Sequence, residues 1–289
     1  MKPAPFEYHA PETVADVVGL LAEHGDDAKP LAGGQSLVPM LALRLARFGH
    51  LVDLNRVDGL RGVERHDGVL SVHAMTTQAM VERDPEVARA APLLARVTPL
   101  IGHFQIRNRG TLGGSLAHAD PASEYPAVAL ALDASLEVAS AAGSVRVPAS
   151  EFFEGTWQTS MGPDQVLVAA HFPVWEGRCG FACEEVARRA GDFALAGVVA
   201  AVQLDENGSV ERAGIGLLGL GSTPLRARAA EVELLGKPPP VGAALRELGE
   251  LAVRDVDPVD DVHASATYRR RVGAHLVART QAGAIQEAQ

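Results

Sequence analysis

Apolar residues recur every three to four positions between residues 14 and 21, in the segment "ETVADVVGLLAEHG". This spacing places them on one face of an α-helix. Thr13 and Asp16 have the spacing of a capping box, which satisfies backbone N–H groups where a helix starts, and Gly25 is a typical stop. The pattern therefore predicts a helix that ends just before Gly25.

A short apolar run, a second helical pattern and another short apolar run follow this helix. Their sequences are "AKPLAGG", "SLVPMLALRLARF" and "HLVDL". Strand, helix and strand in this order, with short connections, are typical of a βαβ unit. We therefore expect the opening of the chain to be α/β.

The middle of the chain mixes strand and helix patterns. "GVLSVHAMTTQAMVE" predicts a strand, a turn and a helix with Thr76 as its N-cap. Residues 85–107 have helical periodicity interrupted by Pro92 and Pro99, which predicts two broken helices. Residues 108–132 are glycine-rich and then helical. Strands are expected in "ASLEVAS" and "GSVRVPA", and residues 151–174 are expected to form a loop that closes on another strand.

The character of the chain changes near residues 175–183. Beyond that point, residues 193–221 predict a hairpin about the turn "DENGS". A helix should follow from Ser222 or Thr223, with Pro224 in its first turn, and helical patterns fill residues 241–256 and 265–288. We expect a first domain of residues 1–176, divided into subdomains of about 1–57 and 58–176, and a second domain of residues 177–289.

Composition and charge narrow the class of protein. Of the 289 residues, 47% are hydrophobic and 21% are charged, which is typical of a globular chain. The formal net charge of −10 argues against nucleic-acid binding, which needs clustered Lys and Arg. No apolar run has the roughly 18 residues that a membrane span requires, and the first residues contain no apolar signal core. We therefore expect no membrane span and a cytoplasmic location.

Few residues suit a protein-held metal. Cys179 and Cys183 are too few for an iron–sulfur cluster or a structural zinc site, which need about four ligands. No pair of histidines has the spacing of a zincin helix. We expect reduced, half-buried thiols, with a disulfide as the lesser alternative, and no metal on this chain.

Three familiar catalytic motifs are weak or absent. "GIGLLG" (Gly214 to Gly219) matches G-x-G-x-x-G, but it lies inside a predicted strand and not between a strand and a helix, so close strand packing is the favoured interpretation. None of the three lysines follows a glycine-rich loop as a Walker motif demands. Ser36 and Ser115 do not stand in the G-x-S-x-G context of a hydrolase nucleophile.

Two Gly-Gly steps remain, each beside a hydroxyl residue and each before a helical pattern. They are "AGGQS" (Ala32 to Ser36) and "TLGGS" (Thr111 to Ser115). Glycines let backbone N–H groups face one concave spot without obstruction by Cβ atoms, which suits phosphate oxygens. Either step alone is more simply a structural turn. Together they indicate a diphosphate ligand held from both sides.

With these residues in view, the chain resembles the flavoprotein (medium) subunit of the molybdenum hydroxylases, the xanthine dehydrogenase and carbon monoxide dehydrogenase family. The matching segments are "FEYHAPETVADVVGLLAEHGDDAKPLAGGQSLVPMLALRL", "IGHFQIRNRGTLGGSLAHADPASEYP", "RRAGDFALAGVVAA" and "GLGSTPLRA". The resemblance implies an α+β fold. In it, an FAD-binding domain of the vanillyl-alcohol-oxidase (PCMH) type, made of two α/β subdomains, precedes a C-terminal domain with an antiparallel sheet and helices.

The resemblance also implies which residues bind FAD. The pyrophosphate would meet Ala32, Gly33, Gly34, Gln35 and Ser36 on one side, and Thr111, Gly113, Gly114 and Ser115 on the other. Ile101 would lie near the adenine part, Asp120 and Glu124 near sugar or ribityl hydroxyls, and Phe193 beside the isoalloxazine, where some relatives carry a tyrosine. His118 is either a flavin contact or a turn residue. Leu37 and Ala117 complete the expected set.

The implied function is electron transfer. A small subunit with [2Fe-2S] clusters would pass electrons to FAD on this chain, and FAD would pass them to an external acceptor, while molybdopterin belongs to a large subunit. The expected assembly is a dimer of heterotrimers. No side chain here needs to act as a general acid or base. Two alternatives stay open, a stand-alone FAD-dependent dehydrogenase or oxidase and a non-enzymatic nucleotide-binding module.

Overall fold

A small parallel sheet begins the chain. The computed structural model describes residues 2–289, and its first sheet has the strand order β1-β3-β2 with parallel pairing. The capped helix predicted from the sequence is confirmed, because the Thr13 hydroxyl accepts from the Asp16 amide and Gly25 ends the helix with a φ of 53°. The elements are β1 (Glu7–His9), α1 (Val14–His24), η1 (Gly25–Asp27), β2 (Ala28–Leu31), α2 (Leu37–Ala42), β3 (His50–Asp53) and η2 (Leu54–Arg56).

The second sheet is antiparallel throughout, with the strand order β4-β5-β10-β6-β7. Its strands are β4 (Val63–His66), β5 (Val69–His73), β6 (Ser135–Ser140), β7 (Gly143–Pro148) and β10 (Val166–Pro173). Helices and a small hairpin occupy the connections: α3 (Gln78–Arg83), α4 (Pro85–Ala90), α5 (Pro92–Val97), η3 (Thr98–Leu100), α6 (Phe104–Arg107), α7 (Leu112–His118), α8 (Glu124–Ala131), α9 (Ala149–Phe152), β8 (Phe153–Gly155) and β9 (Gln158–Thr159).

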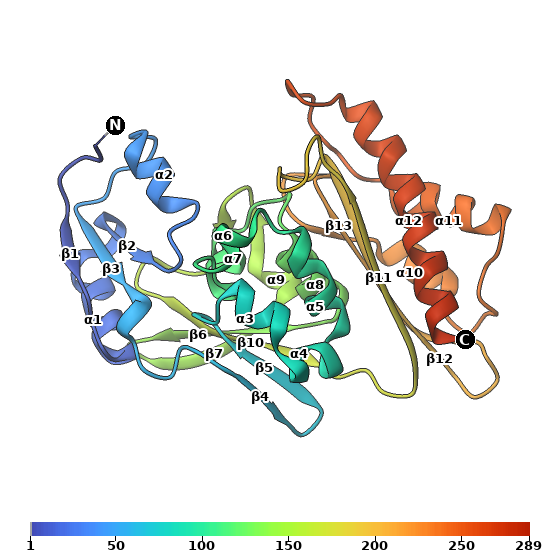
Figure 1. The fold of residues 1–289 in the computed structure, drawn as a ribbon, viewed down its shortest axis with the longest axis horizontal. Helices are drawn as coiled ribbons and strands as arrows, with labels where there is room; N and C mark the ends of the chain where they lie inside the picture. The colour runs from blue at the N-terminus through green and yellow to red at the C-terminus, as the bar shows by residue number, and fades with distance from the viewer. Residues whose placement is uncertain (1) are drawn as a thin grey trace.

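The third sheet is also antiparallel, in the order β11-β12-β13-β14. It consists of β11 (Arg178–Val186), β12 (Ala196–Leu204), β13 (Val210–Leu218) and β14 (Leu225–Arg226), followed by α10 (Arg228–Leu234), α11 (Ala243–Ala252) and α12 (Ala266–Ala288). Figure 1 shows the three sheets side by side along the long axis, with α12 on the outer side of the third. Among residues 2–289, no helix combines the length and the apolar character that a membrane span requires.

Helices cover both faces of the third sheet. Alternate residues of a strand point to opposite faces. Val198, Ala200 and Val202 of β12 accordingly pack in the core beneath the C-terminal helices, while Val199 and Ala201 pack in the core that contains α8. Burial on both faces explains why β12 is almost continuously apolar.

Two glycines of "GIGLLG" allow α8 to pack directly on this sheet. A Cβ atom at Gly214 would lie 2.0 Å from the carbonyl oxygen of Ala131, and one at Gly216 would lie 2.3 Å from that of Ala127. Both glycines lie inside β13, as predicted, and no helix follows them directly. The motif therefore serves close packing between strand and helix.

Hydrogen bonds and ion pairs join the third sheet and its helices to the helices of the second sheet, and Arg226 of β14 pairs with Asp133, just after α8. Arg226 of β14 donates to the Leu130 carbonyl at 2.7 Å and to Glu231 at 2.8 Å, and its side chain is 8% exposed. Arg96 of α5 pairs with Glu287 of α12 at 2.5 Å. A buried guanidinium with several acceptors fixes orientation as well as proximity.

Four expectations about individual elements are wrong in detail. Thr77 and not Thr76 caps α3, because the buried Thr76 hydroxyl bonds both backbone groups of Gly62. The helix expected from residue 36 stops at Ala42, before Arg44 with a φ of 58°. The helix expected at Ser222 starts at Arg228, because β14 comes first. The segment 85–107 contains four short helical pieces and not two.

We predict that Gly214→Ala destabilises the protein by about 1–3 kcal/mol or more, because the new methyl group overpacks the contact between β13 and α8. Urea unfolding followed by circular dichroism measures this. Gly19→Ala is the control, since a Cβ at this exposed position of α1 meets no atom within 4 Å, and it should stabilise the helix by about 0.5–1 kcal/mol. Equal stability of Gly214→Ala and the wild type would contradict the packing account.

Candidate functional site

The loop of residues 32–37 leaves the end of β2 and enters α2. Gly34 has a φ of 72°, which favours glycine, and Gly33 is buried. Within the part of the chain that the structure describes, no protein acceptor lies in hydrogen-bonding position to the backbone N–H groups of Gly33, Gly34, Gln35, Ser36 and Leu37. Gly33 is buried, Gly34, Ser36 and Leu37 are half-buried and Gln35 is exposed. Because a buried N–H group is nearly always paired, the free donor at Gly33 indicates a ligand or ordered water, and the donors that follow it extend the row toward the start of α2.

The carbonyl groups of the same loop, unlike its N–H groups, accept hydrogen bonds from within the protein. The Ala32 carbonyl accepts from the Asn55 side chain at 3.3 Å, and the Gly33 carbonyl accepts from the Gln35 side chain at 2.9 Å. The carbonyls of Gly34 and Ser36 accept from backbone N–H groups of α2. The 32–37 loop therefore has free donors and satisfied acceptors, which favours an anionic partner.

The second Gly-Gly step lies against the first. A Cβ at Gly33 would lie 2.2 Å from the Arg109 carbonyl oxygen, and a Cβ at Gly114 would lie 3.2 Å from the Ala32 side chain. The structure thus brings together the 32–37 loop and residues 109–115. The first segment connects elements of the first sheet, and the second lies between β5 and β6 of the second sheet.

The amide groups of residues 112–115, in the first turn of α7, are already engaged. The Gly113 N–H donates to the Ala74 carbonyl at 2.9 Å, and the Gly114 N–H donates to the Thr111 hydroxyl at 3.0 Å. Ser115 N–H donates to the Thr111 carbonyl. A Cβ at Gly113 would lie 2.5 Å from the Ala74 side chain. These glycines therefore provide close approach of backbones and not free donors.

Polar side chains surround the connection between α7 and α8. The Trp157 indole N–H donates to Asp120 at 3.1 Å, and the His118 ring stacks on Trp157 with centroids 6.1 Å apart. Ser115 and Ser123 share a hydrogen bond of 3.0 Å. Burial lowers the pKa of His118, although the negative charge of Asp120 opposes the shift. Burial therefore favours the neutral form of the His118 ring.

A buried carboxyl group, Glu124, lies near a half-buried one, Glu185. Glu124 is the first residue of α8 and is 7% exposed, and burial, with the nearby charge of Glu185, raises its pKa to about 8. Burial also raises the pKa of Glu185, on β11, to about 7, and one of its oxygens has no protein partner. A helix start favours a negative charge, but desolvation outweighs it here.

Ile101 and Phe193 lie in two loops that contact each other. A Cβ at Gly191 would lie 2.4 Å from the His103 ring, so the loop between β11 and β12 packs on the segment after η3. The Phe193 side chain is 66% exposed, and Ile101 packs against the second sheet's core. Within residues 2–289, neither Ile101 nor Phe193 is hydrogen-bonded to the 32–37 loop.

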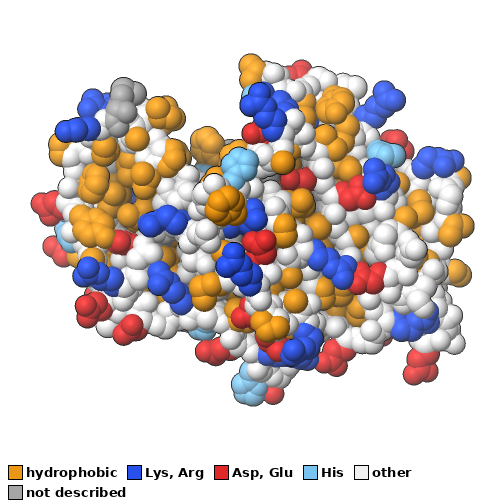
Figure 2. Space-filling view, in the orientation of Figure 1, with side chains coloured by type: hydrophobic (Ala, Val, Ile, Leu, Met, Phe, Trp, Pro, Cys, Tyr) orange, Lys and Arg blue, Asp and Glu red, His pale blue; other side chains and the backbone are white. Residues whose placement is uncertain are grey.

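The molecular surface is hollowed at the edge where these loops meet. Figure 2 shows a notch between the lobe that carries α2 and the lobe that carries α12. In Figure 1, α6 and α7 lie below this notch. The end of α7 therefore lies between the two lobes, below the notch.

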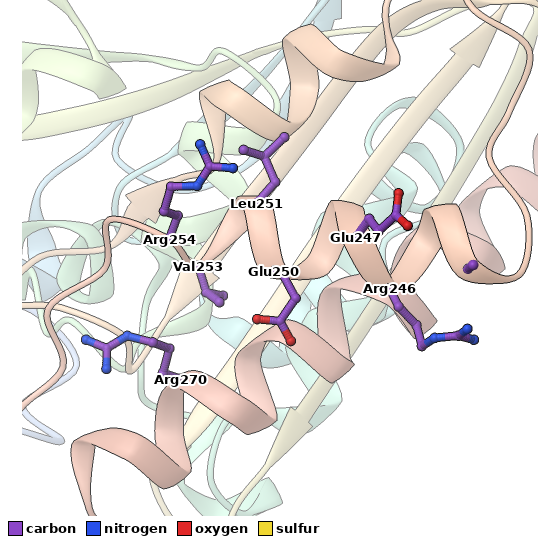
Figure 3. A pocket seen from close by; sticks show the side chains of 8 residues that line it. Arg246, Glu247, Glu250, Leu251, Val253, Arg254 and Arg270 are labelled. Atoms are coloured by element: carbon purple, nitrogen blue, oxygen red, sulfur yellow. The ribbon is translucent and has the colours of Figure 1, made fainter.

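A separate hollow of about 540 Å³ lies far from these loops, on α11 and α12. Figure 3 shows Arg246 and Arg270 pointing to opposite sides of Glu250. Because the guanidinium groups do not converge and carboxylates alternate with them, this hollow does not form an anion site.

Three residues that contact or influence the expected site residues Ala32, Asp120 and Glu124 were not expected from the sequence. Trp157, Asn55 and Glu185 come from segments that carry no motif. Only their hydrogen bonds and burial in the folded chain reveal them. The expected thiols are confirmed as free and half-buried, and burial raises the pKa of both to about 11.

Comparison with known families agrees with this geometry. The family "FAD binding domain in molybdopterin dehydrogenase" matches residues 4–175. The family "CO dehydrogenase flavoprotein C-terminal domain" matches residues 181–284. The two matches together cover almost the whole chain.

Curated relatives match from end to end. The chain is 41% identical to the 6-hydroxypseudooxynicotine dehydrogenase complex subunit alpha of Paenarthrobacter nicotinovorans, over 100% of this chain and 97% of the relative. It is 37% identical to the carbon monoxide dehydrogenase medium chain of Hydrogenophaga pseudoflava, over 96% of each. Such identity over full length shows a shared family.

Solved structures share the same fold. Carbon monoxide dehydrogenase from Hydrogenophaga pseudoflava superposes with a TM-score of 0.96 at 37% identity, covering 99% of both chains. Quinoline 2-oxidoreductase from Pseudomonas putida 86 gives a TM-score of 0.93 at 36% identity, covering 100% of this chain and 99% of the other. The α+β, PCMH-type fold expected from the sequence is confirmed, and the chain belongs to the FAD-binding medium subunits of the molybdenum hydroxylase family.

Proposed function

We propose that this chain binds FAD with its diphosphate against the 32–37 loop and works as the electron-transfer subunit of a molybdenum hydroxylase complex. The observation that carries the proposal is the row of free N–H groups from Gly33 to Leu37. A hydrogen bond to a charged group contributes about 1.5–3 kcal/mol. Several such bonds hold a diphosphate without a lysine.

The remaining expected residues have different proposed roles. Gly113 and Gly114 bring α7 close to the cofactor by packing, since their N–H groups are engaged. Thr111 positions the Gly114 N–H, and Ser115 is proposed to contact the cofactor from the first turn of α7 and Ala117 from its last turn. Ala32, through its contact with Gly114, keeps the two loops together.

The ring system of the flavin is proposed to lie toward the C-terminal lobe. His118, Trp157 and Asp120 form a hydrogen-bonded and stacked group at the end of α7. Phe193, largely exposed, covers the open side with an apolar ring that has no hydroxyl. We propose Ile101 as the apolar contact of the adenine part and Asp120 with Glu124 as partners of sugar or ribityl hydroxyls.

The protein's own contribution is binding, orientation and exclusion of water. FAD, when bound, supplies the chemistry of taking up electrons singly and holding two. The 32–37 loop fixes the charged end. Glu124 holds a proton at neutral pH, because burial raises its pKa to about 8. Its carboxyl group can therefore donate a hydrogen bond to a ligand oxygen.

The assembly and the location are part of the same proposal. We propose a small [2Fe-2S] subunit as electron donor, a large molybdopterin subunit, a dimer of heterotrimers and a cytoplasmic location. Two free, half-buried thiols suit a reducing compartment. We also propose functional units of residues 1–57, 58–176 and 177–289, each built around one of the three sheets.

Gly34→Val should lower the FAD content of the purified full-length chain at least tenfold. At a φ of 72° a β-branched residue is strained, and its Cβ would lie 3.0 Å from Val38 and 3.3 Å from Leu31. Relief of these contacts turns the neighbouring N–H groups away from the diphosphate. Heat-released flavin per chain, measured by absorbance, checks the prediction.

Gly68→Val is the matched control for backbone strain. Gly68 has a φ of 74° in the exposed turn between β4 and β5, away from the notch. This variant should keep its flavin although its turn is strained. A Gly34→Val protein with wild-type flavin content would remove the 32–37 loop from the binding site.

Glu124→Gln should flatten the pH dependence of stability in the flavin-free protein. The raised pKa of Glu124 means that its stabilising contribution is complete below about pH 4 and is lost as pH rises through about 8. In that window the wild type should lose up to about 1.4 kcal/mol per pH unit through this group. Urea unfolding at several pH values measures the slope.

The control for this variant is Glu151→Gln, at an exposed position of α9. It removes one carboxylate without changing a buried group, so its pH profile should follow the wild type. If Glu124→Gln and Glu151→Gln gave the same profile, Glu124 would not hold the proposed proton.

A further inference from the structure

Three histidines from separate elements meet on the first sheet. His9 ends β1, His24 ends α1 and His50 begins β3. One ring nitrogen of each lies within 4.8 Å of the other two. The sequence positions are far apart, so motif spacing gives no sign of this group.

The parallel register explains why the three side chains meet. His9 pairs with Val52 in the β1–β3 register, and His50 stands two residues before Val52, so both histidines point to the same face of the sheet as Val52. Val52 packs in one core with residues of α1, so this face is the one that α1 covers. His24 lies at the last turn of that helix.

The contacts among the rings are close. His9 Nε2 lies 3.0 Å from His50 Nδ1, and the rings of His24 and His50 stack with centroids 3.7 Å apart. A carboxylate oxygen of Glu7 lies 3.7 Å from His50 Nδ1. All three histidines are half-buried, so the group is reachable from solvent and partly shielded from it.

The composition of this group fits a metal ion better than it fits packing alone. Three imidazoles and a carboxylate are the ligand types of Zn²⁺ and similar ions. Zinc–nitrogen bonds of about 2.0–2.1 Å in a tetrahedral arrangement place ligand nitrogens about 3.3 Å apart, and His9 and His50 already have nearly this separation. Apolar side chains would fill the same space without polar atoms.

We propose that His9, His24 and His50 bind a divalent first-row transition ion, tested here as Zn²⁺, with Glu7 or water as the fourth ligand. Two stacked rings cannot both direct a lone pair at one ion. Binding therefore requires the ring of His24 or His50 to turn about its Cβ–Cγ bond, and half-burial leaves room for this.

The ion would join β1, α1 and β3. The strands of this sheet have only three or four residues each, so a cross-link among three elements stabilises it. The 32–37 loop leaves the same sheet at the carboxyl end of β2, whereas His50 stands at the amino end of β3. The proposed ion is thus a structural support for the lobe that carries the 32–37 loop.

Calorimetric titration of the tag-free, full-length, FAD-loaded chain with Zn²⁺ tests the proposal. We expect saturable binding of one ion per chain. His24→Ala and His9→Gln should each weaken it at least tenfold, because even outer partners of a metal ligand contribute about 10- to 100-fold. His66→Ala, which removes a histidine side chain that is 86% exposed, should bind like the wild type.

Thermal unfolding gives a second readout. Zn²⁺ should raise the unfolding midpoint of the wild type and of His66→Ala, because a ligand that binds only the folded state stabilises it. It should not raise the midpoint of His24→Ala or His9→Gln. These variants come from different elements, so a folding defect in one leaves the other informative. The proposal would be overturned if the wild type showed no saturable Zn²⁺ binding. It would also be overturned if His24→Ala and His9→Gln both bound Zn²⁺ with the affinity of the wild type.

Discussion

Contacts between backbones that leave no space for a Cβ atom join the three sheets of this protein. Gly33, after β2, lies against the Arg109 carbonyl, which belongs to the connections of the second sheet. Gly214, in the third sheet, lies against the Ala131 carbonyl of α8. Each contact brings a loop or helix of one lobe onto the backbone of the next. Glycine at these positions therefore sets how closely neighbouring lobes approach each other.

The two Gly-Gly steps look alike in sequence and have different physical roles. In the 32–37 loop, the donors are free and the carbonyls are bonded. In the first turn of α7, the N–H groups of Gly113 and Gly114 are bonded within the protein. One step thus supplies hydrogen-bond donors, and the other supplies close approach. The sequence indicated a diphosphate held from both sides. The hydrogen bonds favour a diphosphate that is held mainly by the N–H groups of the 32–37 loop.

Local patterns predicted the elements whose causes are local. The Thr13 cap, the βαβ unit and the hairpin about "DENGS" depend on neighbours in sequence, and they are present. Thr76 failed as a cap because its hydroxyl bonds Gly62, a distant residue. β11 was missed because its second face is covered by helices far along the chain. The glycine pairs of the site were visible in sequence, but the histidine group and the Glu124–Glu185 pair arise only from tertiary contacts.

The central claim is that the N–H groups of residues 33–37 bind the cofactor diphosphate. Amide hydrogen exchange of the full-length chain, with and without FAD, tests it most directly. The account predicts slow exchange at residues 33–37 only when FAD is bound, while Gly113 and Gly114, already hydrogen-bonded, exchange slowly in both states. Unchanged exchange at residues 33–37, with new protection at Gly113 and Gly114, would contradict it.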